Sequence, residues 1–526
     1  MANRNELLKR LKELSIAQFE QVLFYLKIDP SIIPSIFAEQ SIRAIKVIQR
    51  LEQEKDGWKR LEKALADSSL EIIDKNYIGY EITAQVKQII SGYIQQPFEG
   101  REEEKRQLDE FVRKNSSGVL LVTAAAGFGK SALLSHWQQT QQEDFFIAYH
   151  CFSYRYQKTR SLFEAYRHLL KQLYLYYNIS NGDFPNDENE MRDILVGMLS
   201  KPVSPAGKPL VIVLDGLDEA EKTFDPFFTE LPDSVCVIAS ARAEENEEPK
   251  YLRNWTDNAQ RLYLNRLPCE AISKLLGQIS ELAAYSEDDE FVKSLDQTTD
   301  GFPLYLRYLI DDLKQAATNY QDVQALVRNC PVGFKDYVKE QFQQLAKVEE
   351  IKQQQKVQQL FALLSVALGA LSKDDIEDLT SLTVWDLADL PWQATRWFSI
   401  QNDIYSFAHP LLADEFQGVL GRQAKSAQNQ LIDYCVRWQE HHSTYALRYY
   451  AEHLGRVKRW EELYSLLTEF EYLYTKISAL GSQPLIEDYN LAFNLELAAF
   501  EEGLQHKADS LKLIQDVLRL VLNIVP

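Results

Sequence analysis

The spacing of hydrophobic residues changes twice along the chain and divides it into three parts. In residues 1–66, apolar side chains recur every three or four positions, which predicts a small bundle of amphipathic helices. Between 118 and 264, short continuous apolar runs stand between polar loops, as in strands buried on both faces of a parallel sheet. From residue 267 onward the helical spacing returns. We therefore expect an α/β core between an all-α N-terminal bundle and a helical C-terminal part.

The apolar runs also give the approximate positions of individual elements. Strands are expected at 118–123, 145–149, 209–214, 235–239 and 262–264. Two further short runs, 397–400 and 404–407, flank Gln401-Asn-Asp403 and predict a hairpin. Helices are expected near 102–113, 333–347, 356–369, 460–467, 485–502 and 508–525. A hairpin that follows short helices indicates a winged-helix subdomain at 351–421.

The first expected strand leads into a loop suited to bind phosphate. Residues 124–131 read Ala-Ala-Ala-Gly-Phe-Gly-Lys-Ser, although the strict pattern begins with glycine where this chain has Ala124. Small residues let successive N–H groups point inward, and the N-terminus of the following helix adds partial positive charge. Lys130 is placed to reach the β- and γ-phosphates of ATP or ADP, and the Ser131 hydroxyl to bind Mg²⁺. The residues expected to contact nucleotide here are Ala126, Gly127, Phe128, Gly129, Lys130, Ser131 and Ala132.

The third expected strand ends in acidic residues, Asp215-Gly-Leu-Asp-Glu219. Because the carboxyl ends of parallel strands share one edge of the sheet, these carboxylates are expected beside the phosphate loop. Asp215 is expected to hold Mg²⁺, directly or through water, and either Asp218 or Glu219 to orient or deprotonate the attacking water. Arg242, just past the fourth strand, is expected to sense or stabilise the γ-phosphate, with an ordinary surface arginine as the alternative.

The composition fits a multidomain protein of a reducing compartment. A chain of 526 residues with 45% hydrophobic content can form several packed cores. The five cysteines form no CxxC pair, which argues against a zinc site and for a cytoplasmic location. No apolar run approaches the roughly 18 residues of a membrane span, so no membrane contact is expected. The net charge of −20 disfavours nucleic acid as the main partner.

Taken together, the loop at 124–131, the run LDGLDEA at 214–220 and Ser240-Ala-Arg242 resemble the NACHT-type branch of the STAND ATPases. The resemblance runs from about Phe98 to Leu420. It implies a signalling switch that is closed with ADP, opens and oligomerises with ATP and Mg²⁺, and hydrolyses ATP slowly. It also implies three further groups of nucleotide contacts. These are Phe98 and Arg101 of the FEGR run beside the adenine, Pro303 of the GFP run, and His409 of the FAHP run, which contacts the ADP phosphate in that family.

The N-terminal helices offer no catalytic chemistry. The runs AQFEQVLFYLKIDPSIIP and SIRAIKVIQRLEQ resemble the effector-associated domains of bacterial conflict systems. That resemblance implies an adaptor that recruits an effector protein in bacterial defence or programmed cell death. A dimerisation or packing module is the plainer alternative.

These expectations divide the chain into six regions: an adaptor at 1–66, a linker at 67–97, an NTPase domain at 98–266, a helical subdomain at 267–350, a winged helix at 351–421 and a helical arm at 422–526. The run YALRYYAEHLGRVKRWEELYSLL resembles the arm that joins such ATPase cores to a C-terminal sensor. Either a sensor lies beyond this chain, or the arm itself senses the trigger. A P-loop phosphotransferase and a DNA-dependent ATPase are the competing functions.

Overall fold

The computed structural model describes residues 77–493 and 509–517, apart from short gaps of which the longest is 201–207, and single positions between 7 and 61. The chain forms two compact units, Met1–Ile89 and Ile90–Pro526. The described positions of the first unit include a fully buried apolar cluster against which Trp58 packs. Its members are Leu7, Leu11, Val22, Leu26, Ala44, Val47, Ile48, Leu51 and Leu61. The other residues on which the expected helical bundle at 1–66 depends lie outside the described part.

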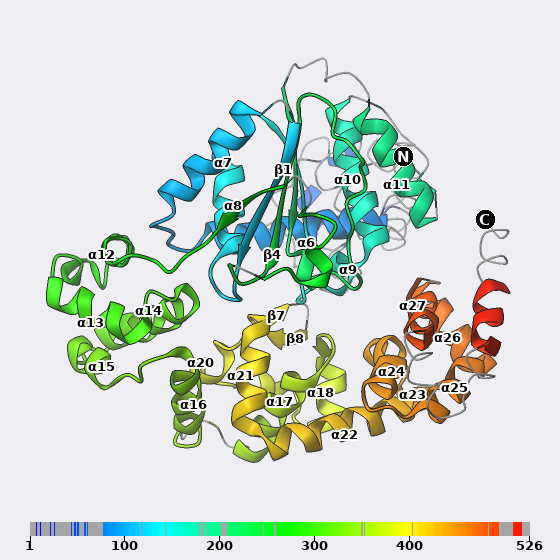
Figure 1. Ribbon diagram of the computed structural model, residues 1–526. Helices are drawn as coiled ribbons and strands as arrows, with labels where there is room; N and C mark the ends of the chain where they lie inside the picture. The colour runs from blue at the N-terminus through cyan, green and yellow to red at the C-terminus, as the bar shows by residue number, and fades with distance from the viewer. Residues whose placement is uncertain are drawn as a thin grey trace. The chain divides into compact units, whose positions relative to one another are not determined.

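The second unit is built around a five-stranded parallel sheet with the order β2-β3-β4-β1-β5 (Figure 1). The strands are β1 (Ser117–Ala124), β2 (Phe146–Cys151), β3 (Leu210–Asp215), β4 (Val235–Arg242) and β5 (Ala259–Tyr263). Each overlaps a strand expected from the sequence, and the expected α/β fold class is confirmed. Every residue of β3 is buried, as its uninterrupted apolar run requires.

Helices cover both faces of this sheet (Figure 1). Helices α7 (Glu102–Lys114) and α8 (Lys130–Gln141) lie on one face, and α10 (Leu162–Tyr176) and α11 (Glu188–Leu199) on the other. Shorter elements connect them, namely α9 (Gln157–Arg160) and the 3-10 turns η3 (Leu217–Glu219) and η4 (Lys250–Leu252). Helix α6 (Tyr77–Ile94) precedes the core and spans the boundary between the two units.

Beyond the sheet the chain is mainly helical. The first group comprises α12 (Cys269–Gly277), η5 (Ala283–Tyr285), α13 (Asp289–Thr299), α14 (Pro303–Thr318), α15 (Val323–Asn329) and α16 (Phe334–Leu345). The second comprises α17 (Gln354–Val366), α18 (Lys373–Thr380), α19 (Val384–Ala388), α20 (Trp392–Thr395) and α21 (Pro410–Leu420). Within it, β6 (Leu371–Ser372), β7 (Phe398–Gln401) and β8 (Ile404–Phe407) form an antiparallel sheet of order β6-β8-β7. The expected hairpin is therefore present, although Trp397 precedes its first strand.

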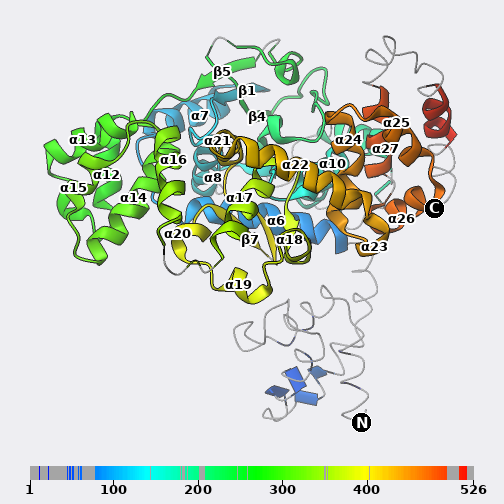
Figure 2. The same ribbon diagram turned by 90° about the horizontal axis from the view of Figure 1, so that it is seen from below.

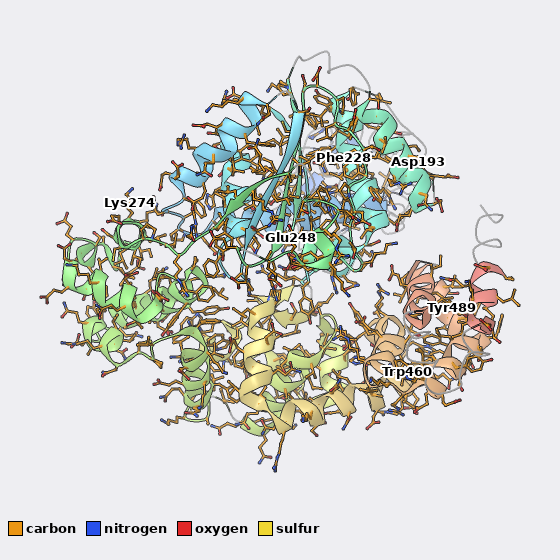
Figure 3. The ribbon with its side chains drawn as sticks, viewed as in Figure 1. Asp193, Phe228, Glu248, Lys274, Trp460 and Tyr489 are labelled. Atoms are coloured by element: carbon orange, nitrogen blue, oxygen red, sulfur yellow. The ribbon has the colours of Figure 1, made fainter. Side chains whose placement is uncertain are left out.

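The last group of helices packs together at one end of the second unit (Figure 2). It comprises α22 (Arg422–Val436), α23 (Trp438–His441), α24 (Thr444–Arg456), α25 (Trp460–Thr468), α26 (Phe470–Leu480) and α27 (Gln483–Phe493). One buried apolar cluster continues from Leu267 to Leu511. Tyr489, labelled in Figure 3, is completely buried within it and donates a hydrogen bond to the carbonyl of Leu467 at 2.5 Å. In the described part of the chain, no helix has both the length and the apolar character needed to cross a membrane.

Candidate nucleotide-binding site

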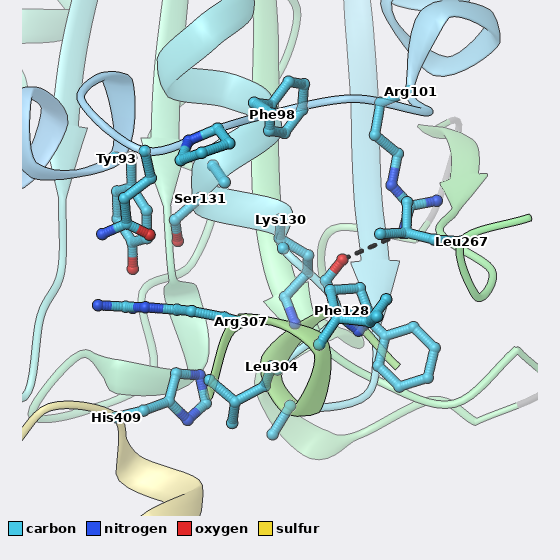
Figure 4. A pocket seen from close by; sticks show the side chains of 18 of the residues that line it. Tyr93, Phe98, Arg101, Phe128, Lys130, Ser131, Leu267, Leu304, Arg307 and His409 are labelled. Atoms are coloured by element: carbon cyan, nitrogen blue, oxygen red, sulfur yellow. Dashed lines mark hydrogen bonds between the residues drawn. The ribbon is translucent and has the colours of Figure 1, made fainter. Parts of the chain in front are cut away.

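A cavity of about 320 Å³ lies at the carboxyl edge of the parallel sheet (Figure 4). Segments far apart in the sequence form its walls: the stretch before α7, the phosphate loop, the ends of β3 and β4, the start of α14, and the residue before α21. All but one of the residues singled out from the sequence line it. They are Phe98, Arg101, Ala126, Gly127, Phe128, Gly129, Lys130, Ser131, Ala132, Asp218, Glu219, Arg242, Pro303 and His409. Asp215 is the exception.

The phosphate loop curls through two glycines in the left-handed region of backbone space. Gly127 has φ +82° and Gly129 has φ +87°, values that other residues seldom adopt. Ala124, where the strict motif has glycine, is the last residue of β1 and is fully buried. The substitution therefore falls on extended strand backbone, which needs no glycine. Lys130 Nζ donates to the carbonyls of Ala124 and Ala125 at 3.0 and 3.1 Å, so the ammonium lies inside the loop.

Arg242 and Asp218 form a pair beside this loop. The register of β1 and β4 sets Arg242 opposite Ala124, at the carboxyl edge of the sheet. The Arg242 backbone N–H donates to Asp218 Oδ1 at 2.8 Å, and its Nε lies 3.7 Å from Oδ2. The arginine side chain is 40% exposed and lines the cavity. Arg242 is therefore paired with Asp218 and borders the cavity, and its role toward the γ-phosphate stays a prediction.

Glu219 differs from Asp218 in its surroundings. Its Oε2 accepts a hydrogen bond from the Tyr154 backbone N–H at 2.7 Å. Burial raises the pKa of Glu219 to about 7, and the adjacent Asp218 carboxylate adds to the rise. A carboxylate that titrates near neutral pH has the basicity that a general base needs. The raised pKa therefore makes Glu219 a candidate proton acceptor.

Asp215 lies behind the cavity wall and is completely buried. Ser240 Oγ donates to its Oδ1, and Tyr149 Oη donates to its Oδ2 at 3.2 Å. Burial raises the pKa of Asp215, while hydrogen bonds from neighbouring groups, Ser131 among them, act in the opposite direction. Ser131 thus connects this carboxylate to the cavity. Both modes expected for Asp215, direct contact with Mg²⁺ or contact through water, remain predictions, and Asp215 itself does not line the cavity.

The described residues form no group of three or more His, Cys, Asp or Glu side chains that could hold a metal ion. A Mg²⁺ ion at Ser131 would therefore need phosphate oxygens and water among its ligands, as Mg²⁺ commonly has in nucleotide sites.

The two residues expected beside the adenine have different surroundings. The Phe98 ring stacks on His136, with ring centroids 4.3 Å apart. Arg101 is 3% exposed and donates to the Phe128 carbonyl at 3.2 Å, a bond drawn as a dashed line in Figure 4. It also donates to the Asn265 carbonyl at 2.7 Å and pairs with Glu104 at 2.8 Å. Arg101 lines the cavity, but its guanidinium is engaged with protein acceptors.

His409 and Pro303 extend the site into the helical part of the chain. Pro303 is the first residue of α14, and His409 caps the start of α21, where its Nδ1 accepts from the Leu411 N–H at 3.1 Å. Burial holds the pKa of His409 well below its usual range. Four cationic side chains act in the same direction, namely Arg155, Lys130, Arg242 and Arg307. Because Nδ1 accepts the Leu411 N–H, a neutral ring carries its proton on Nε2, and this N–H donates to no residue that the structure describes.

Sequence analysis missed two arginines that line the cavity, Arg155 and Arg307. In Figure 4, Arg307 lies in the space between the phosphate loop and His409. Arg155 follows β2 by four residues, and Arg307 lies one helical turn beyond Pro303. Either position could have been found by asking which cations follow a strand end or share a helix face with a motif residue.

Residues 103–242 match the family model for the N-terminal region of nephrocystin 3. No curated protein matches the chain. Among solved structures, one similar protein is a STAND ATPase with a tetratricopeptide repeat sensor from Pyrococcus horikoshii. It is 15% identical with a TM-score of 0.41, and the match covers 78% of this chain and 57% of that one. The chain therefore matches little more than half of that protein's length.

Two further similar structures are shorter proteins. Cdc6p of Pyrobaculum aerophilum is 12% identical with a TM-score of 0.30, and the match covers 62% of this chain and 94% of that one. The ORC2 protein of Aeropyrum pernix is 14% identical with a TM-score of 0.35, with coverages of 63% and 95%. The family-model match covers β1 to β4, the phosphate loop and the acidic strand end, which together have the architecture of a P-loop ATPase.

Proposed function

We propose that this chain is a nucleotide-dependent signalling switch of the STAND class, with a NACHT-type ATPase domain that binds ADP in a closed state and ATP with Mg²⁺ in an open, oligomerising state. The observation that carries the proposal is the composition of the cavity wall. The phosphate loop, Pro303 and His409 line one cavity, although about 280 residues separate the first from the last. A nucleotide held there would contact the ATPase core, the first group of helices through Pro303 and the second group through His409. Its phosphates could therefore set how these two groups are arranged on the core.

Each residue of the site has a role in this proposal. Lys130, with the backbone N–H groups of 126–132, binds the phosphates, because the glycines open the loop and the ammonium already lies within it. Ser131 and, through it, Asp215 hold Mg²⁺, which neutralises phosphate charge when bound. Glu219 serves as the base that accepts a proton from water, and Asp218 holds Arg242 toward the γ-phosphate. Hydrolysis is slow and resets the switch.

His409 is the proposed lock of the closed state. Its Nδ1 is occupied by the Leu411 N–H, so Nε2–H is the donor available to a phosphate oxygen. Because the side chain caps α21, a bond from His409 to ADP would hold the whole second group of helices against the ATPase core. We propose that residues 351–421 form a winged-helix subdomain and that loss of this bond releases it.

The remaining parts of the proposal concern regions outside the cavity. The N-terminal helices act as the adaptor that recruits an effector protein, and clustering on oligomerisation brings these adaptors together. The setting is a cytoplasmic defence or cell-death response, and the trigger is a protein or other ligand rather than a membrane or nucleic acid. Residues 422–526 act as the arm that receives it.

The first test is the nucleotide carried by the purified full chain, measured by chromatography after denaturation. Stoichiometric ADP supports a closed switch. If no nucleotide is present and titration with ATP or ADP and Mg²⁺ gives no binding, the proposal is wrong.

Variants then test individual roles. Lys130→Ala is expected to abolish nucleotide binding, because it removes the one cation inside the loop, whereas Lys114→Ala makes the same change on an exposed helix face outside the cavity and serves as control. Glu219→Gln and Asp218→Asn are expected to bind ATP and hydrolyse it more slowly, and the variant with the larger loss identifies the base. An unchanged hydrolysis rate in both would remove the acids from the catalytic machinery.

A further inference from the structure

A short segment after β2 contacts the cavity and the C-terminal helices at the same time. We call residues 153–157 the bridging loop. Ser153 and Arg155 line the cavity, and the Tyr154 N–H donates to Glu219. The loop is thus in direct contact with the acid that has the basicity of a general base.

Arg155 is the cationic side chain of this loop. Its guanidinium donates no hydrogen bond and forms no ion pair with any residue that the structure describes. The nearest aromatic ring is that of Tyr93, 5.9 Å from the guanidinium carbon. A guanidinium carries five N–H donors, and polar groups turned away from bulk water are normally paired. A cation of this kind at a cavity wall indicates that an anionic ligand completes its contacts.

The position of Arg155 indicates which part of a nucleotide it meets. Arg155 directly follows Tyr154, whose backbone N–H donates to Glu219 Oε2 at 2.7 Å, and Arg155 and Glu219 line the same cavity, so the arginine lies near the acid expected beside the attacking water. Water attacks the terminal phosphate of ATP, so a cation near that acid faces the γ-phosphate. The β-phosphate belongs to the phosphate loop, where Lys130 lies.

The residues on either side of Arg155 hold three separate C-terminal elements. Tyr154 Oη donates to the Ala367 carbonyl at 2.6 Å, just beyond α17. Tyr156 Oη donates to Gln401 of β7, and Gln157 accepts from Tyr449 of α24. If a phosphate displaces Arg155, the neighbouring residues move with it, and their bonds to α17, β7 and α24 change.

We propose that Arg155 binds the γ-phosphate of ATP and that the bridging loop transmits its presence to α17, β7 and α24. This inference rests on the proposed function of the cavity. It adds a residue that distinguishes ATP from ADP and a route by which that difference reaches the arm, separate from the His409 contact with ADP.

The test compares ADP with the non-hydrolysable analogue AMP-PNP, each with Mg²⁺, by calorimetric titration of the full chain. Losing a charge-assisted contact to phosphate weakens binding about 10–100-fold. Arg155→Gln is expected to lose this factor for AMP-PNP, while its ADP affinity changes by less than about threefold. Arg155→Lys is expected to recover part of the AMP-PNP affinity. The control is Arg192→Gln, the same change on exposed α11, for which both affinities should equal those of wild type.

Equal losses for both nucleotides, or no loss for either, would overturn the assignment of Arg155 to the γ-phosphate. A different result, wild type binding neither nucleotide, would refute the proposed function, and the inference about Arg155 would fall with it.

Transmission is tested by hydrogen exchange at saturating nucleotide. Wild type is expected to differ between ADP and AMP-PNP in the exchange of α17, β7 and α24. Tyr154→Phe removes only the hydroxyl bonded to Ala367, so it should bind AMP-PNP with wild-type affinity yet show a smaller difference at the end of α17. A wild-type difference confined to α14 and α21, or one unchanged in Tyr154→Phe, would show that the signal does not pass through the bridging loop.

Discussion

The two glycines of the phosphate loop offer a matched pair of substitutions. Gly127→Ala and Gly129→Ala both place a methyl group on left-handed backbone, at φ +82° and +87°. The backbone cost of that conformation for a non-glycine residue is about 1–2 kcal/mol and should be similar at both. The positions differ in what a Cβ would meet. At Gly129 nothing lies within 4 Å, whereas at Gly127 the Phe302 ring lies at 2.6 Å and Leu304 Cβ at 3.0 Å.

The clash at Gly127 involves the residues that begin α14. Forcing a methyl group into a packed contact costs about 1–3 kcal/mol in addition to the backbone cost. The Phe302 ring packs on both Phe128 and Phe334, so it has little room to withdraw. We expect Gly127→Ala to push the start of α14 away from the phosphate loop, and Gly129→Ala to leave it in place.

Differential scanning calorimetry of the nucleotide-free full chain measures the difference. For a domain of 150–250 residues, each kcal/mol lowers the melting temperature by about 2–4 °C. The ATPase-domain transition of Gly127→Ala is therefore expected about 2–12 °C below that of Gly129→Ala. Equal transitions in the two variants would refute the close packing of α14 on the loop. A larger drop in melting temperature for Gly129→Ala than for Gly127→Ala would also refute this packing.

Three further predictions follow from individual side chains. Because burial raises the pKa of Glu219 to about 7, the base is protonated below that pH, and kcat/KM for ATP should rise from pH 6 to 8. Asp218→Asn removes one cause of the raised Glu219 pKa and should move the pH profile to lower pH. An unshifted profile would show that the Asp218 charge does not act on the group that titrates. His409→Ala should release ADP faster and raise spontaneous assembly on size exclusion, whereas unchanged ADP retention would remove His409 from the site. Lys476 and Asp488 form a buried ion pair, so Lys476→Met should lower the urea stability of the arm by about 3–5 kcal/mol, and adding Asp488→Leu should restore most of it.

The core could be predicted from the sequence because its signals are local. A strand buried on both faces needs an uninterrupted apolar run, and β1, β3 and β4 have one. Their order in the sheet could not be predicted this way. β4 lies between β1 and β3, and pairings between distant segments leave no trace in either segment alone.

The boundary errors have tertiary causes. The helix expected at 356–369 ends at Val366. The backbone groups of the next two residues form hydrogen bonds with tyrosines from elsewhere in the chain. Tyr154 donates to the Ala367 carbonyl, and Tyr445 accepts from the Leu368 N–H at 3.1 Å. The helix expected at 485–502 begins at Gln483 and is described as far as Phe493, so its expected end lies outside the described residues.

The site was predictable wherever a residue belongs to a compact motif, as Lys130 and Asp218 do. Arg155 and Arg307 escaped because each stands alone in sequence and becomes a cavity residue only through the fold. Asp215 stands out in the sequence, but its full burial and its hydrogen bonds depend on side chains from β2 and β4 that no local pattern specifies. The sequence motifs therefore identify many of the residues that line the cavity, but not Arg155 and Arg307.

Arg101 has a mechanical consequence for the cavity. Its single buried guanidinium bonds the phosphate loop at Phe128 to the chain after β5 at Asn265, and its backbone starts α7. Arg101 therefore links these three segments to one another. One wall of the cavity carries Arg101 and Lys130, and another carries Pro303 and His409. In the proposed switch, nucleotide is therefore released when Pro303 and His409 move away, while the phosphate loop keeps its conformation.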